Sequence, residues 1–101
     1  MLCKLYNNGY ITVEDISYIS PLECGYLTAW YKIYFKSGTI LQQNLELDID
    51  RDKGLIYISN NPYITEKLDY DDLRNCSFYK EFKDCYDNLL EKYKESHEKI
   101  S

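Results

Sequence analysis

Residues 26–35, YLTAWYKIYF, decide the fold that this sequence predicts. The stretch is dense in aromatic and β-branched side chains, which favour a β-strand. Because side chains alternate across a strand, odd-numbered residues share one face and even-numbered residues share the other. The odd-numbered face is the more apolar and contains Leu27, Ala29, Tyr31, Ile33 and Phe35. The opposite face carries Trp30 and Tyr34 beside Lys32.

Hairpins are predicted on both sides of this strand. Residues 36–39, KSGT, indicate a turn, and residues 39–45, TILQQNL, a strand that returns antiparallel. Residues 46–49 and 55–59 flank the turn sequence DRDKG and indicate a second hairpin. Near the start, Asn7-Asn8-Gly9 tolerates positive φ and predicts a turn between residues 3–6 and 10–13. These segments together predict an antiparallel sheet of four to five strands.

Residues 10–21 allow two interpretations. In the first, Tyr10 to Val13 alternates and pairs back across the turn. In the second, Thr12 stands three residues before Asp15 and caps a single helical turn. Pro21 ends the element in both.

The last third of the chain changes its periodicity. Asn60-Asn61-Pro62 breaks the preceding strand, and Thr65 is a suitable N-cap for a short acidic helix over about residues 66–74. A longer amphipathic helix is predicted from Ser77 to about residue 96. Its apolar positions at helical spacing are Phe78, Phe82, Cys85 or Tyr86, Leu89 and Tyr93. Strands followed by helices predict an α+β fold in which the helices pack on one face of the sheet.

Length and composition predict one domain over residues 1–101. The chain is 45% hydrophobic, which suits a globular domain. No apolar stretch approaches the ~20 residues that cross a bilayer, and the first eight residues lack the pattern of a signal peptide. Four cysteines lie far apart without a Cys-x-x-Cys pair, which favours free thiols over a zinc site or a disulfide framework. We therefore expect a cytoplasmic protein.

Patterns that would indicate catalysis or metal binding are weak. Asp48-x-Asp50-x-Asp52 resembles the first half of a calcium-binding loop, but Lys53 replaces the required glycine and Ser59 the terminal glutamate. The one histidine, His97, lies in a charged tail, so no Cys–His pair is predicted. The glycines are isolated, which argues against a phosphate-binding loop. We expect no metal, no cofactor and no enzymatic activity.

Two features of the composition point to binding instead. Residues 46–76 contain eight acidic and four basic residues, a net charge of −4, whereas residues 1–45 have three of each. Twelve tyrosines add side chains that are favoured in interfaces. Clustered carboxylates complement a basic surface and speed association with it. The residues predicted to bind a protein partner are Asp48, Asp50, Asp52, Tyr63, Glu66, Asp69, Tyr70, Asp71 and Asp72, together with Trp30 and Tyr34.

Two alternatives are open for the sheet face that carries Trp30 and Tyr34. Either residues 10–21 fold over this face, or it is exposed as an aromatic platform. Direct binding of nucleic acid is not predicted, because Lys32 and Lys36 alone do not form the basic groove that such binding requires. Membrane binding is not predicted either.

In its general character the chain resembles small anti-CRISPR and related anti-defence inhibitors of phages and mobile elements. The resemblance lies in the length, the acidity and the Asn-, Lys-, Ile- and Tyr-rich composition, and it rests on no motif. It implies an inhibitor in the cytoplasm of a bacterial host that binds the basic surface of a Cas nuclease or a related effector complex. The alternative is a small structural or regulatory accessory protein that forms a homodimer through its aromatic sheet face.

Overall fold

The computed structural model describes residues 1–68 and 75–98, except for the side chain of Glu98. Its elements are β1 (Leu2–Lys4), β2 (Tyr10–Thr12), the 3₁₀ turn η1 (Val13–Asp15), β3 (Ile16–Ile19), β4 (Glu23–Cys24), β5 (Thr28–Phe35), β6 (Ile40–Asp50), β7 (Leu55–Ile58), β8 (Asn61–Lys67) and α1 (Ser77–Glu98). A six-stranded antiparallel sheet has the order β3-β5-β6-β7-β8, with β4 also paired to β5, and β1 pairs with β2 separately. The predicted α+β class is confirmed, whereas the antiparallel sheet has six strands and not the predicted four to five.

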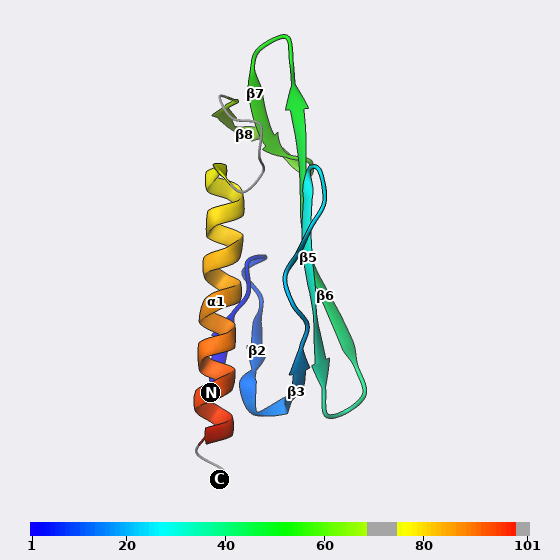
Figure 1. The fold of residues 1–101 in the computed structure, drawn as a ribbon, viewed down its shortest axis with the longest axis vertical. Coiled ribbons are helices and arrows are strands. Elements are labelled where there is room, and N and C mark those ends of the chain that lie inside the picture. The colour runs from blue at the N-terminus through cyan, green and yellow to red at the C-terminus, as the bar shows by residue number, and fades with distance from the viewer. Residues whose placement is uncertain (69–74, 99–101) are drawn as a thin grey trace.

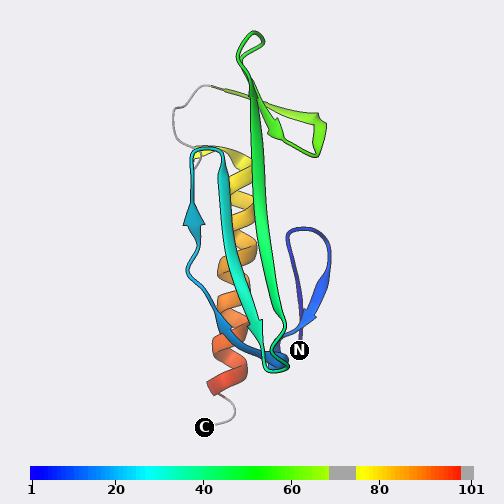
Figure 2. The same cartoon turned by 90° about the vertical axis from the view of Figure 1, so that its right-hand side faces the viewer.

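The molecule has two layers and an elongated shape. Figures 1 and 2 show α1 and the β1–β2 hairpin on one side of the six-stranded sheet, and the β6–β7 end of the sheet reaching beyond α1. The extents are 54 × 20 × 20 Å and the radius of gyration is 15.5 Å, against about 13 Å for a compact domain of this length. The fold therefore exposes more surface than a globular chain of equal size.

The β5–β6 hairpin follows the predicted alternation. Ala29, Tyr31 and Ile33 are at most 1% exposed, and their strand pairs with all of residues 40–46 of β6. Gly38 has φ of +94° in the connecting turn, a conformation that glycine adopts without steric cost. The two segments predicted at 39–45 and 46–49 form one continuous strand of 11 residues.

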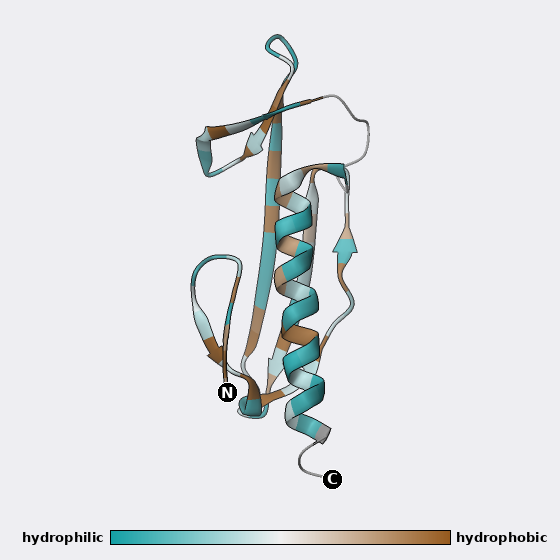
Figure 3. Cartoon of the chain, turned by 90° about the vertical axis from the view of Figure 1, so that its left-hand side faces the viewer, coloured by the Kyte–Doolittle hydropathy of each residue, from teal (hydrophilic) through white to brown (hydrophobic). Residues whose placement is uncertain are grey.

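The core lies between the sheet and α1, and the long helix is confirmed. Phe82 and Leu89 are fully buried, and the ring of Phe82 lies 5.6 Å from that of Tyr31 and 5.3 Å from that of Tyr6. Figure 3 shows that the outward face of α1 is mainly hydrophilic, and Lys83 pairs with Asp87 there at 2.7 Å. Apolar burial of this single helical stripe holds the two layers together.

The prediction of a short acidic helix over about residues 66–74 is wrong for its first residues, which the structure describes as strand. Thr65 and Glu66 belong to β8, where they pair with Tyr57 and Ile56 of β7. The unpaired edge of β7 offers backbone hydrogen-bond partners to this segment, and this tertiary pairing overrides the N-cap signal of Thr65. Residues 69–74 of the predicted helix lie outside the described residues. Pro62 is accommodated because β8 is an edge strand.

Residues 10–21 combine both predicted interpretations. β2 pairs with β1 across the Asn7-Asn8-Gly9 turn, and η1 follows without a side-chain cap from Thr12. β3 then joins the edge of β5, where Tyr18 lies opposite Tyr34. The segment therefore widens the sheet, and of the two alternatives for the face of Trp30 and Tyr34 the one in which residues 10–21 fold over it does not hold.

Candidate functional site

The sheet face opposite α1, which we call the open face, has no covering element among the described residues (Figure 1). Strand alternation places Trp30 and Tyr34 of β5 on it, and the register sets them opposite Asn44 and Ile40 of β6. The other members include Tyr18, Thr28, Lys32, Gln42, Glu46, Asp48, Asp50, Leu55 and Tyr57. The open face is therefore a continuous surface over four strands.

One half of the open face is aromatic. Tyr18 and Ile40 are 52% and 55% exposed, and both flank Tyr34 on neighbouring strands. The ring of Tyr18 lies 5.6 Å from the ring of Tyr34 in a tilted arrangement. Tyr34 and Trp30 are half-buried. This half presents apolar area together with phenolic hydroxyl groups.

The other half of the open face is acidic. Glu46, Asp48 and Asp50 occupy alternate positions of β6, and Asp52 follows in the β6–β7 turn. The Asp50 carboxylate accepts a hydrogen bond from the Lys53 N–H at 3.2 Å. In the portion of the chain with described side chains, none of these four carboxylates forms an ion pair. Glu46, Asp48 and Asp52 are exposed, and Asp50 is half-buried.

The basic residue inside this acidic region is directed elsewhere. Arg51 lies in the β6–β7 turn, and its Nη2 donates a hydrogen bond of 3.1 Å to the hydroxyl of Tyr26. Tyr26 is 70% exposed and precedes β5. This contact extends the acidic half with a further exposed tyrosine that the sequence reasoning did not select.

Glu66, by contrast, has a structural role. Its two carboxylate oxygens accept the N–H of Ser77 at 3.1 and 3.4 Å. Ser77 is the first residue of α1, where unpaired N–H groups and the helix dipole favour a negative charge. Glu66 is therefore held at the helix start and is not a member of the open face.

The remaining predicted residues are dispersed. Tyr63 is 93% exposed in the irregular part of β8, where the pairing passes from Ile58–Asn61 directly to Tyr57–Thr65. Asp69, Tyr70, Asp71 and Asp72 lie outside the described residues. The structure thus places Asp48, Asp50, Trp30 and Tyr34 on one sheet face, with Asp52 following Asp50 in the turn. Tyr34 lies opposite Ile40, ten residues along β6 from Asp50, so the aromatic and acidic residues occupy different ends of that face.

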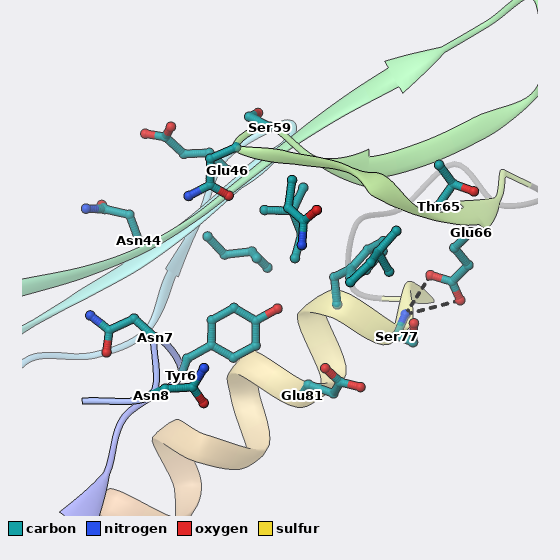
Figure 4. Close-up of a pocket in the computed structure, with 16 residues that line it drawn as sticks. Tyr6, Asn7, Asn8, Asn44, Glu46, Ser59, Thr65, Glu66, Ser77 and Glu81 are labelled. Carbon is teal, nitrogen blue, oxygen red and sulfur yellow. Dashed lines mark hydrogen bonds between the residues drawn. The ribbon is translucent and has the colours of Figure 1, made fainter. Parts of the chain in front are cut away.

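A cavity of about 880 Å³ lies on the other side of the sheet edge (Figure 4). It is bounded by the tip of the β1–β2 hairpin, the middle of β6, the β7–β8 hairpin and the first turns of α1. Its apolar lining comes from Tyr6, Leu45, Ile58, Ile64 and Phe78. Four separate parts of the chain build this cavity, so no sequence pattern indicates it.

Three of the four cysteines are poorly placed for nucleophilic chemistry. Burial raises the pKa of the Cys3, Cys76 and Cys85 thiols above the ordinary value, which keeps them protonated and weakly nucleophilic. The Cys76 sulfur accepts the Tyr79 N–H at 3.3 Å and so helps to begin α1. Cys24 is exposed.

Within residues 1–68 and 75–98, no three His, Cys, Asp or Glu side chains form a group suited to a metal ion. In the same ranges, no helix has the length and apolar character needed to span a membrane.

No protein-family model, curated protein or solved structure matches this chain.

Proposed function

We propose that this protein acts by stoichiometric, non-enzymatic binding of a partner protein with a basic surface, and that the open face is the binding surface. The observation that carries the proposal is the row of uncompensated carboxylates, Glu46, Asp48 and Asp50, on a sheet face that no described element covers. Alternate strand residues lie roughly 7 Å apart. A row of negative charges at this spacing complements a surface that binds a polyanion.

The two halves of the open face contribute differently. The carboxylates attract a basic partner over a distance of about a Debye length and raise the association rate. The aromatic half, with Tyr18, Trp30 and Tyr34, supplies contact area that slows dissociation once the partner is bound. In line with its resemblance to anti-defence inhibitors, the protein would occupy the nucleic-acid-binding surface of a host effector complex.

The test begins with an affinity pull-down from a bacterial host lysate and continues with the purified partner. We expect the triple substitution of Asp48, Asp50 and Asp52 by Lys to weaken binding at least tenfold, about 1.4 kcal/mol. The loss should diminish as salt is raised, since salt screens exposed charges. The corresponding substitutions at Asp69, Asp71 and Asp72 test the second acidic region that the sequence predicts.

A charge-matched control separates a local effect from a general one. Asp84, Glu91 and Glu95 are exposed residues of α1, so their replacement by Lys changes the net charge equally on another surface. We expect this control to bind nearly as the parent does. Equal losses for both triple variants would show that net charge, and not the open face, governs binding.

A second candidate function is self-association through the aromatic half. The exposure of Tyr18 and Ile40 at 52% and 55% favours it. Apolar association does not weaken with ionic strength, so a dimer that persists in sedimentation at high salt would support this alternative.

A further inference from the structure

Strand β6 is paired along only part of one edge. β5 pairs with residues 40–46 on one side, whereas β7 pairs with residues 47–50 on the other. The Leu47 N–H donates to the Leu27 carbonyl on the β5 side, and the Glu46 carbonyl accepts the Ser59 N–H on the opposite side. Because backbone groups alternate in direction along a strand, the even-numbered residues face away from β5.

This alternation defines an open edge. The N–H and C=O groups of Ile40, Gln42 and Asn44 point away from β5, and no backbone group of the described chain pairs with them. An unpaired strand edge is a template for another strand. The side chains of Gln42 and Asn44 stand on the open face, and the Gln42 amide N–H donates to the Asn44 side-chain oxygen at 2.8 Å there.

The open edge ends at the cavity of Figure 4. Asn44, Leu45 and Glu46 contribute to its lining, as do Tyr6 and Phe78. The volume of about 880 Å³ lies within the range of roughly 300–1,000 Å³ that is usual for ligand sites. A chain paired to the edge at Asn44 would therefore place its next side chains in or beside a preformed space.

The charge of the cavity lining favours a basic ligand. The described lining includes Glu46, Glu66 and Glu81 and contains no Lys, Arg or His. Glu66 is held by the Ser77 N–H, whereas Glu46 and Glu81 form no ion pair with a described side chain. A second copy of the chain, which carries a net charge of −5, would be repelled here.

We propose that the open edge binds an extended, basic peptide segment of a partner protein by strand addition to residues 40–44 of β6, with a basic side chain at the cavity beside Glu81. Main-chain hydrogen bonds supply affinity in such complexes, and side-chain pockets supply specificity. Glu46 and Asn44 belong to both surfaces, so the two proposals are separated by the backbone N–H of Asn44 and the Glu81 carboxylate on one side, and by Asp48, Asp50 and Asp52 on the other.

The probe is a fluorescein-labelled octapeptide of alternating Lys and Val. Its binding to the protein is measured by fluorescence anisotropy at low salt. We expect it to bind the parent, and the matched Glu–Val octapeptide to bind at least tenfold more weakly. Asn44→Pro removes the N–H at the edge without removing a β5 hydrogen bond, so it should weaken binding at least tenfold. Asn44→Ala loses the same side chain but keeps the N–H, and should bind within about twofold of the parent.

A measurement independent of variant folding uses the probe itself. Methylation of the peptide N–H groups blocks strand pairing and keeps the charge, so the N-methylated octapeptide should lose at least tenfold in affinity. Binding that is unchanged by N-methylation, or competed equally by spermine, would show a simple cation site and overturn the proposal. A parent that dimerises through this edge, and becomes monomeric in Asn44→Pro, would overturn it in favour of a second copy.

The two proposals are distinguished with the same reagents. In the triple Lys variant at Asp48, Asp50 and Asp52, the normal octapeptide should still bind more tightly than the N-methylated one. The ratio of the two dissociation constants measures strand pairing apart from charge, and it should stay close to that of the parent. Glu46→Gln combined with Glu81→Gln should reduce peptide affinity severalfold and flatten its salt dependence. An unchanged salt dependence in this double variant would contradict the assignment of the cavity charges.

Discussion

The hydroxyl of Tyr86 donates a hydrogen bond of 2.9 Å to the backbone carbonyl of Ser20, which lies 66 residues earlier in the chain. Two turns further along α1, Tyr93 donates to the carbonyl of Ser17 at 2.9 Å. Ser17 belongs to β3, and Ser20 follows directly after it. These two tyrosines therefore attach the helix to the edge of the sheet, a structural use of residues whose abundance the sequence reasoning assigned to binding.

Replacing Tyr86 by Phe should destabilise the fold by about 1 kcal/mol, because the Ser20 carbonyl loses its partner while the ring packing is kept. Urea denaturation measures this as a lower midpoint with an unchanged slope. Tyr10→Phe is the matched control, since Tyr10 is 65% exposed. Equal stabilities of the two variants would show that the Tyr86 hydrogen bond contributes nothing.

Replacing Tyr31 by Phe should not destabilise the fold, in contrast to Tyr86→Phe. Tyr31 is 1% exposed, and its hydroxyl has no hydrogen-bond partner in the described structure. Removing a buried, unsatisfied hydroxyl recovers part of its desolvation cost, so we expect unchanged stability or a gain of up to about 1 kcal/mol. A loss of more than about 1 kcal/mol in urea denaturation would contradict this.

Phe82→Ala should destabilise the domain by about 3–5 kcal/mol, since it opens a cavity at a fully buried position. Its ring contacts those of Tyr6 and Tyr31, so the change loosens the hairpin, the sheet and α1 together. This loss is a large part of a total stability of about 5–15 kcal/mol. Asp84→Ala, at an exposed position of α1, should leave the urea midpoint nearly unchanged. An unaltered midpoint for Phe82→Ala would mean that α1 does not pack as described.

Glu66→Ala should cost about 1 kcal/mol, because Ser77 loses the acceptor of its N–H at the start of α1. Amide hydrogen exchange should become faster in the first turn of α1, and circular dichroism should show a small loss of total helical signal. Glu91→Ala removes an equal charge from an exposed site of α1 and should change stability by less than about 0.5 kcal/mol. If Glu66→Ala is as stable as Glu91→Ala, the carboxylate does not cap the helix.

Stability should fall as the pH rises above about 9. Burial raises the pKa of Cys3 and Cys76 above 9.0 and that of Tyr31 above 10.0 in the folded protein. Below pH 9 these groups are protonated in both states and leave stability unchanged. At higher pH they ionise first in the unfolded chain, which favours unfolding. Urea midpoints at pH 7, 9 and 10.5 test this, and a midpoint that is constant or rises would contradict it.

The local elements were predictable because their signals are short-range. The alternation of residues 26–35, the turn around Gly38 and the helical spacing of Phe78, Phe82 and Leu89 each depend on neighbours along the chain, and each is confirmed. Thr65 shows where such signals fail. Its N-cap pattern is real, but pairing with Tyr57 of β7, eight residues earlier in the chain, outweighs it.

The sequence by itself determined the fold class, the α1 stripe and the acidic charge of residues 46–52, because periodicity and composition encode them. The tertiary structure alone decided which carboxylates act together. Asp48 and Asp50 share the open face with Trp30, whereas Glu66 turns to Ser77. It also left residues 40–44 of β6 with an unpaired edge beside a cavity. The physical reason is that strand register and helix placement join residues far apart in the chain, and these long-range pairings are absent from any local pattern.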